Sequence, residues 1–330
     1  MNDRTKKVLK AAGITAGAAA AAVVSAYVST KYMMDIALDR QEPKALKVAD
    51  RFIAGTQGNN AFLKKLEEDS QRLARRENEV IRLTSHDGIE LVGHLIEAPY
   101  PKRVVLAFHG WRSSWHRDFG MIADFLYNND CTVLYAEQRG QNESGGEYMG
   151  FGLTERYDCR DWANWAAERF GPEMPLYLTG VSMGATTVLM AAGLDLPASV
   201  RGIAADCGFT SPQAIWKHVA EDNLHLNFRL RSAIADAIYK QRLMVGSGSC
   251  STLDALRITK IPIMLVHGAD DHFVPVKMTY ENYIACAAPK KLLIVPGADH
   301  GMSYFVEPAR YEASVRSFWK QYDGYKPAKA

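Results

Sequence analysis

From residue 103 onward, short apolar runs alternate with longer segments of helical pattern, and this alternation constrains the fold more than any other feature. The apolar runs cover residues 103–108, 131–136, 176–180, 202–205, 261–266 and 291–295. The helical patterns cover residues 118–128, 155–170, 183–193, 275–287 and 304–320. Strands that are apolar on both faces and are separated by crossover helices indicate a mostly parallel sheet between helical layers. We therefore predict an α/β fold.

A β-hairpin is expected ahead of the parallel strands. The runs 79–84 and 90–97 flank residues 85–89, in which Asp87-Gly88 supplies the geometry of a tight turn. This hairpin would begin the main domain, which we place at residues 79–330.

One interval is too long for a simple crossover. Roughly fifty residues separate the run at 202–205 from the run at 261–266, which is more than one connection needs. They show helical patterns at 213–222 and 231–243, followed by the Gly/Ser-rich residues 246–249. We expect a small helical cap inserted at about 207–260.

The charge of the chain is nearly balanced, with its basic excess at the N-terminus. The 330 residues include 39 Lys+Arg and 37 Asp+Glu, which gives a net charge of +2. The chain therefore lacks the strong positive charge that is typical of a nucleic-acid-binding protein. Residues 1–10 contribute +3, from four basic residues against Asp3, which leaves the rest of the chain at −1.

An uncharged segment follows this basic start. Residues 11–30 contain no charged side chain, and twenty helical residues would extend about 30 Å, the thickness of the hydrocarbon core of a bilayer. Basic residues ahead of such a segment keep the N-terminus in the cytoplasm. We therefore expect residues 1–40 to hold a hydrophobic signal-anchor helix, with the main domain on the outer side of the cell membrane and residues 41–78 as a helical stalk.

Two other interpretations of the N-terminus stay open. The small residues near Val24-Ser25-Ala26 resemble a signal-peptidase site, and cleavage there would release the protein. The segment is also dominated by alanine, which partitions weakly into lipid, so an Ala-rich helix in water is the third alternative.

The cysteines do not indicate a metal site. They lie far apart in the sequence, at Cys131, Cys159, Cys207, Cys250 and Cys286. No CxxC spacing or local Cys/His cluster is present, and an odd count is not typical of a disulfide framework. We expect buried free thiols, and no metal or organic cofactor.

The segment Gly180-Val181-Ser182-Met183-Gly184 carries the clearest chemical signal. It follows an apolar run and opens a helical pattern, so strand, G-x-S-x-G and helix come in succession. Glycines on either side of Ser182 permit the sharp turn that exposes a serine hydroxyl, and the helix start places N–H groups beside a developing negative charge. This arrangement is typical of a nucleophile elbow.

A serine nucleophile needs a base and an acid that orients the base. His300 follows the last predicted strand in a short Gly-rich loop, at the edge where an open α/β sheet keeps its active site. The acid is expected between serine and histidine in the chain. Asp270 and Asp271 both follow the preceding strand and are equally placed, Asp206 is a third candidate, and Asp299 adjoins the base too closely.

The ordered motifs resemble those of the α/β-hydrolase superfamily, in particular its bacterial esterase and serine-aminopeptidase-like group, over about residues 80–320. The motifs are His109-Gly110-Trp111, Glu137-Gln138-Arg139-Gly140, Gly180-x-Ser182-x-Gly184, His267-Gly268-x-x-Asp271-x-x-Val274-Pro275 and Gly297-x-x-His300-Gly301. The resemblance implies an α/β-hydrolase fold, with a mostly parallel central sheet flanked by helices. It also implies that Ser182 is the nucleophile, His300 the base and Asp271 the acid.

The same resemblance places the oxyanion hole at the backbone N–H groups of Trp111 and Met183. Relatives more often carry aspartate where this chain has Glu137, a departure that affects a loop and leaves the triad untouched. Arg139, in the same loop, is expected to brace the structure, since its rigid fork of donors joins several acceptors.

These residues predict a serine hydrolase that cleaves carboxylic esters of small molecules through an acyl-enzyme. The cap would cover an acyl pocket, with Trp216 as its candidate substrate contact. The alternatives are a serine peptidase or acyl-peptide hydrolase and, in another class, a non-catalytic protein that uses this fold for binding.

Overall fold

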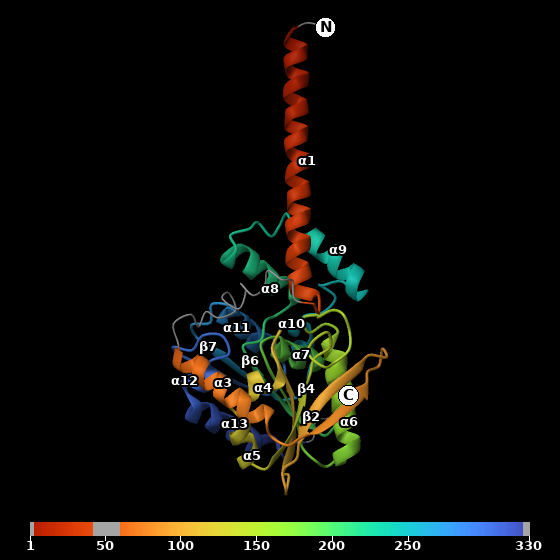
Figure 1. Cartoon of the computed structure of the whole chain (residues 1–330). Coiled ribbons are helices and arrows are strands. Elements are labelled where there is room, and N and C mark those ends of the chain that lie inside the picture. Colours follow the sequence, from red (N-terminus) through yellow and green to blue (C-terminus); the bar gives the residue numbers. More distant parts are fainter. Residues whose placement is uncertain (1–2, 42–59, 326–330) are drawn as a thin grey trace.

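A twisted sheet of eight strands forms the centre of the molecule (Figure 1). The computed structural model describes residues 3–41 and 60–325. The strands are β1 (Glu79–Thr84), β2 (Glu90–Ile96), β3 (Arg103–Phe108), β4 (Cys131–Ala136), β5 (Leu176–Val181), β6 (Val200–Asp206), β7 (Ile263–Gly268) and β8 (Lys290–Val295). Their order is β1-β2-β4-β3-β5-β6-β7-β8, and the strands from β3 to β8 run parallel. The expected hairpin is β1–β2, which pairs antiparallel to β4.

Helices cover both faces of the sheet. One layer consists of α6 (Glu155–Phe170), α7 (Met183–Ala191), α10 (Thr252–Ile258) and α11 (Val276–Ala285). The other consists of α3 (Asn60–Ala74), α4 (Trp115–Phe119), α5 (Ala123–Asn128), α12 (Ser303–Val306) and α13 (Pro308–Tyr322). Alternate residues of β3 enter the two cores, Leu106 and Phe108 on one side and Val105 and Ala107 on the other. Burial on both faces explains why the strands read as continuous apolar runs.

The cap is smaller than the insertion expected from the sequence. It consists of α8 (Pro212–His218), the π-helical turn η2 (Val219–Asn223) and α9 (Ser232–Leu243). The helix α10 also falls within the expected insertion, but it packs against α7 and α11 and so belongs to the helical layer of the sheet. Within the expected insertion at about 207–260, the cap thus ends before α10, the crossover helix that leads into β7.

The N-terminal helix α1 (Asp3–Leu38) projects from the top of the molecule, and its last turns lie beside α9 (Figure 1). Within the part of the chain that the structure describes, no helix combines the length and apolarity needed to cross a membrane. Nearly half of the predicted stalk, residues 42–59, lies outside the described residues. The helix α3, which follows these residues, packs onto the domain, since its side chains Phe62 and Leu73 are buried in the core of the domain.

Candidate active site

The sharp turn between β5 and α7 exposes Ser182. Its backbone has φ 56° and ψ −115°, a strained conformation for a residue with a side chain. The turn is tight on both sides, because a Cβ at Gly180 would lie 2.2 Å from the carbonyl carbon of Gly184, and a Cβ at Gly184 would lie 1.9 Å from the carbonyl oxygen of Phe108. Glycine is therefore required at both positions. The predicted elbow is present, with the serine at the carboxyl end of its strand.

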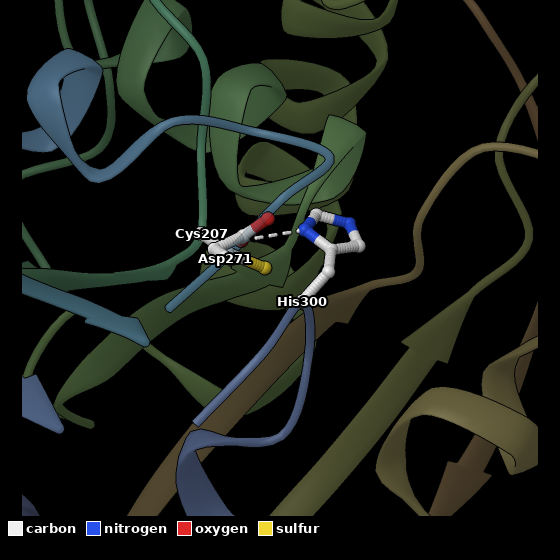
Figure 2. A group of neighbouring side chains, drawn as sticks. All are labelled: Cys207, Asp271 and His300. Atoms are coloured by element: carbon white, nitrogen blue, oxygen red, sulfur yellow. Dashed lines mark hydrogen bonds and ion pairs between the residues drawn. The ribbon is translucent and has the colours of Figure 1, made fainter. Parts of the chain in front are cut away.

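His300 lies between Ser182 and Asp271. Its Nε2 is 3.0 Å from Oγ of Ser182, and its Nδ1 is 2.8 Å from Oδ2 of Asp271. Figure 2 shows the carboxylate and the imidazole facing each other, joined by this contact. The three side chains come from loops after β5, β7 and β8, so the parallel strands bring them to one edge of the sheet. This is the geometry of a nucleophile, a base and an orienting acid.

Of the four candidate carboxylates, Asp271 is the one that faces the base. Its Oδ1 accepts hydrogen bonds from the backbone N–H groups of Phe273 (2.9 Å) and Val274 (2.8 Å), which leaves Oδ2 for His300. Asp270 is exposed to solvent. The other two have different contacts, Asp206 with Ser303 and Asp299 with backbone N–H groups.

A second histidine contacts the acid, and the sequence analysis did not assign it a role at the site. Nε2 of His267 is 3.1 Å from Oδ2 of Asp271 and 2.8 Å from the carbonyl oxygen of Val274, while Nδ1 is 2.6 Å from Oγ1 of Thr279. Since both neighbours of Nε2 are acceptors, the ring proton is assigned to Nε2, and Nδ1 accepts from the threonine hydroxyl. The available sequence signal is the pair His267-Gly268 at the end of its strand.

The acid and the base shift each other's pKa in opposite directions. Burial opposes ionisation of Asp271, but the charge of His300 and hydrogen bonds from His267 and His300 outweigh it and lower the pKa of this carboxyl. Burial likewise disfavours a charged imidazole at His300, but the Asp271 carboxylate outweighs it and raises the pKa of that ring. The pair therefore favours a carboxylate beside an imidazolium, so the ring is a stronger base and its protonated form is stabilised once it has taken a proton.

The loop after β3 lies directly against the serine. A Cβ at Gly110 would be 3.4 Å from Cβ of Ser182. This loop is held by Asp118, which accepts from the N–H of Gly110 at 2.6 Å. Trp111 is the next residue, and Met183 is the first residue of α7, a position whose N–H has no partner within its helix. Met183 thus follows Ser182 directly, and Trp111 adjoins the glycine that packs against it.

An apolar cavity of about 280 Å³ opens beside Ser182. Trp111 and Ser182 lie in its wall, together with Phe151, Phe209 and Phe273. The candidate substrate contact Trp216 also lines it, and within the described residues its indole Nε1 is buried without a hydrogen-bond partner. Residues of α1 form a further part of the wall, which no feature of the sequence predicted.

The loop that carries Arg139 is structural, as expected. The buried guanidinium donates from Nε to Asp158 at 2.6 Å and from Nη1 to Asp87 at 2.7 Å, which ties the hairpin turn to α6. Glu137 also has a structural contact, since its Oε2 lies 3.0 Å from Nε2 of the buried His109. Neither side chain is among the residues that line the cavity.

Two groups of side chains could offer donor atoms to a metal within the described part of the chain. In one, atoms of Cys207, Asp271 and His300 lie within 4.8 Å of one another (Figure 2). Binding a metal there would compete with the hydrogen bond between His300 and Asp271, so the observed contact fits an acid–base pair better. The other group contains Asp158, which already binds Arg139, and Asp161, which already binds His86.

Comparison with known proteins supports the predicted fold. The family profile described as serine aminopeptidase, S33, matches residues 99–240. The esterase Pf2001 of Pyrococcus furiosus superposes with a TM-score of 0.63 at 22% identity, covering 77% of this chain and 94% of that one. The chain thus has the α/β-hydrolase fold, and the family profile matches less than half of its length.

Other relatives show how widely this hydrolase fold is used. A puromycin-hydrolyzing peptidase of Mycobacterium tuberculosis has a TM-score of 0.58 at 18% identity, over 77% of this chain and 40% of its own. The uncharacterized protein YqkD of Bacillus subtilis is 28% identical over 190 residues, which is 56% of this chain and 61% of that relative. The match thus spans less than two thirds of YqkD, and the structural neighbours establish the fold alone.

Proposed function

We propose that this protein is a serine hydrolase that cleaves carboxylic esters of small molecules through an acyl-enzyme. The observation that carries the proposal is the chain of contacts from Ser182 to His300 to Asp271 at the wall of an apolar cavity. A hydroxyl and its base within hydrogen-bond reach, with the base oriented by a carboxylate, is the arrangement that nucleophilic catalysis requires.

In the proposed reaction, Nε2 of His300 accepts the Ser182 proton as Oγ attacks the ester carbonyl. The N–H groups of Trp111 and Met183 would stabilise the oxyanion, and His300 would then protonate the leaving alkoxide. Water attacks the acyl-serine in the same way, which restores the serine hydroxyl and releases the carboxylic acid. Asp271 keeps the imidazole in the tautomer that presents a free Nε2 to the serine.

The lining of the cavity favours an ester over a peptide with a free amino terminus. An aminopeptidase needs a carboxylate to bind the ammonium group of its substrate. Among the described residues that line the cavity there is no Asp or Glu, and the charged side chain is Arg231. Peptide hydrolysis stays the second candidate, because the matching family profile is described as serine aminopeptidase.

A fluorophosphonate probe tests the nucleophile. We expect the full-length protein to be labelled and Ser182→Ala to be unlabelled, because the probe reacts only with an activated serine. Ser249→Ala is the matched control, since Ser249 is exposed in the loop after α9, and it should label like the wild type. An unlabelled wild type would support a non-catalytic binding protein, and undiminished labelling of Ser182→Ala would exclude the assigned nucleophile.

A substrate panel separates the two hydrolase classes. We expect hydrolysis of p-nitrophenyl esters with a kcat/KM far above that for aminoacyl p-nitroanilides. Faster turnover of the anilides would favour the peptidase.

A further inference from the structure

The last turns of α1 are bound to the cap by charged contacts. Arg242 of α9 forms an ion pair with Asp35 and another, at 2.9 Å, with Asp39. The same guanidinium donates to the carbonyl oxygen of Met34 at 3.0 Å. These groups are mostly shielded from water, which strengthens charge-assisted hydrogen bonds.

The same turns are bound to the loop that holds the proposed oxyanion hole. The indole N–H of Trp111 donates to the carbonyl oxygen of Ala37 at 2.8 Å. Arg112 donates to the carbonyl oxygens of Ile36 (2.8 Å) and Asp39 (2.6 Å). The carbonyl groups at the end of α1 therefore find their partners in this loop, which satisfies acceptors that a helix end leaves free.

One face of this segment forms part of the cavity wall. Thr30, Met33, Met34 and Ala37 recur with the three- and four-residue spacing of one helical face, and all line the cavity that contains Ser182. Residues on other faces of the same helix are open to solvent, among them Val28 and Tyr32. A segment that precedes the hydrolase domain by some forty residues thus lines the same cavity as the nucleophile.

We propose that residues 30–37 of α1 are the specificity-determining wall of the acyl pocket, and that they limit the substrate to esters with an apolar acyl chain of medium length. This inference rests on the proposed ester hydrolysis. The cavity is near the lower limit of small-molecule sites, which is about 300 Å³. Its wall is mainly aliphatic, aromatic and methionine side chains, which suit a hydrocarbon chain.

Chain-length profiles of the full-length protein test this wall. Met33→Ala and Met34→Ala would lengthen the pocket, so the ratio of kcat/KM for p-nitrophenyl dodecanoate over butyrate should rise at least about tenfold. Thr30→Phe would fill it, so the ratio of octanoate over butyrate should fall by a similar factor. Butyrate is the internal reference, because a short acyl group would stay close to Ser182.

Val28→Ala and Tyr32→Ala are the matched controls, since both side chains lie on the same helix but face solvent, and their profiles should stay within about twofold of the wild type. Folded Met33→Ala and Met34→Ala variants with unchanged profiles would overturn the proposal. The alanine variants enlarge the pocket, whereas Thr30→Phe fills it. If the variants of one kind do not fold, the chain-length profile of the other kind still tests the proposal. Failure of the wild type to cleave any ester would instead contradict the proposed function.

Discussion

The two carboxylate oxygens of Asp271 have different partners. Oδ1 is held by two backbone N–H groups of its own loop, and Oδ2 faces the imidazole of His300. Because the backbone N–H groups hold the first oxygen, the carboxylate cannot rotate freely. Its second oxygen therefore stays directed at the imidazole ring. Asp270, its neighbour in sequence, is exposed, which makes it a matched comparison.

Replacing Asp271 with Asn should lower kcat for ester hydrolysis by about a thousandfold or more, because the amide no longer holds the correct imidazole tautomer. Asp270→Asn should retain wild-type kcat, since that side chain lies at the surface. Steady-state assays of both variants measure the effect. A larger loss from Asp270→Asn would show that the acid is misassigned.

The pH dependence should report the ionisation of His300. A protonated imidazole cannot accept the Ser182 proton, so kcat/KM should rise with pH through the pKa of His300 in the free enzyme. Because Asp271 raises this pKa, the midpoint should lie above the ordinary value of about 6.5. In Asp271→Asn the midpoint of the residual activity should move to lower pH, and an upward movement would contradict the assigned pair.

At the scale of elements, α10 is the helix that our sequence analysis missed, although its start carries a recognisable signal. Oγ of Ser251 accepts from the N–H of Asp254 at 3.1 Å, and the Asp254 carboxylate accepts from the N–H of Ser251 at 3.0 Å. This reciprocal capping box begins a helix of seven residues that packs against α7, the helix after the elbow. The helix was too short for its apolar periodicity to stand out.

Ser251→Ala should lower the free energy of unfolding by about 1 kcal/mol, because it removes the acceptor for an N–H at the start of α10. Ser249→Ala, two residues earlier and exposed, should change it by less than about 0.5 kcal/mol. Urea denaturation monitored by circular dichroism measures both. Equal effects would mean that the box does not stabilise the helix.

At the scale of the whole molecule, the two parts of the long helix α1 have different surroundings. Its last turns are packed against the cap and the loop after β3, whereas Val23 and Val24 are exposed apolar residues farther from the domain. Cleavage near residues 24–26, the alternative from the sequence, would still leave residues 30–37 on the mature chain. The pocket wall is thus compatible with either an anchored or a released protein.

The membrane location stays a prediction from residues 1–30. We expect the full-length protein to sediment with membranes and to resist a high-salt wash, because the uncharged residues 11–30 follow a basic segment. Fractionation of cells, with protease added to spheroplasts to test on which side the domain lies, provides the measurement. A protein found mainly in the soluble fraction would contradict the anchor.

The sequence by itself determined the sheet, its hairpin, the elbow at Ser182 and the loop that carries His300. These features depend on neighbouring residues, namely continuous apolar runs, the Asp-Gly turn, and glycines where the backbone leaves no room for a Cβ. Such signals are local, so they can be recognised in a single chain.

Only the tertiary structure decided what depends on residues far apart. Their position after the strand did not distinguish Asp270 from Asp271 as the acid, and the resemblance favoured Asp271. In the structure, packing at the edge of the sheet directs Asp271 toward His300 and leaves Asp270 exposed to solvent. The pocket wall is another example, because the contact between Asp35 and Arg242 spans most of the chain. No local pattern marks such a contact, since it exists only once the cap and the sheet edge have come together.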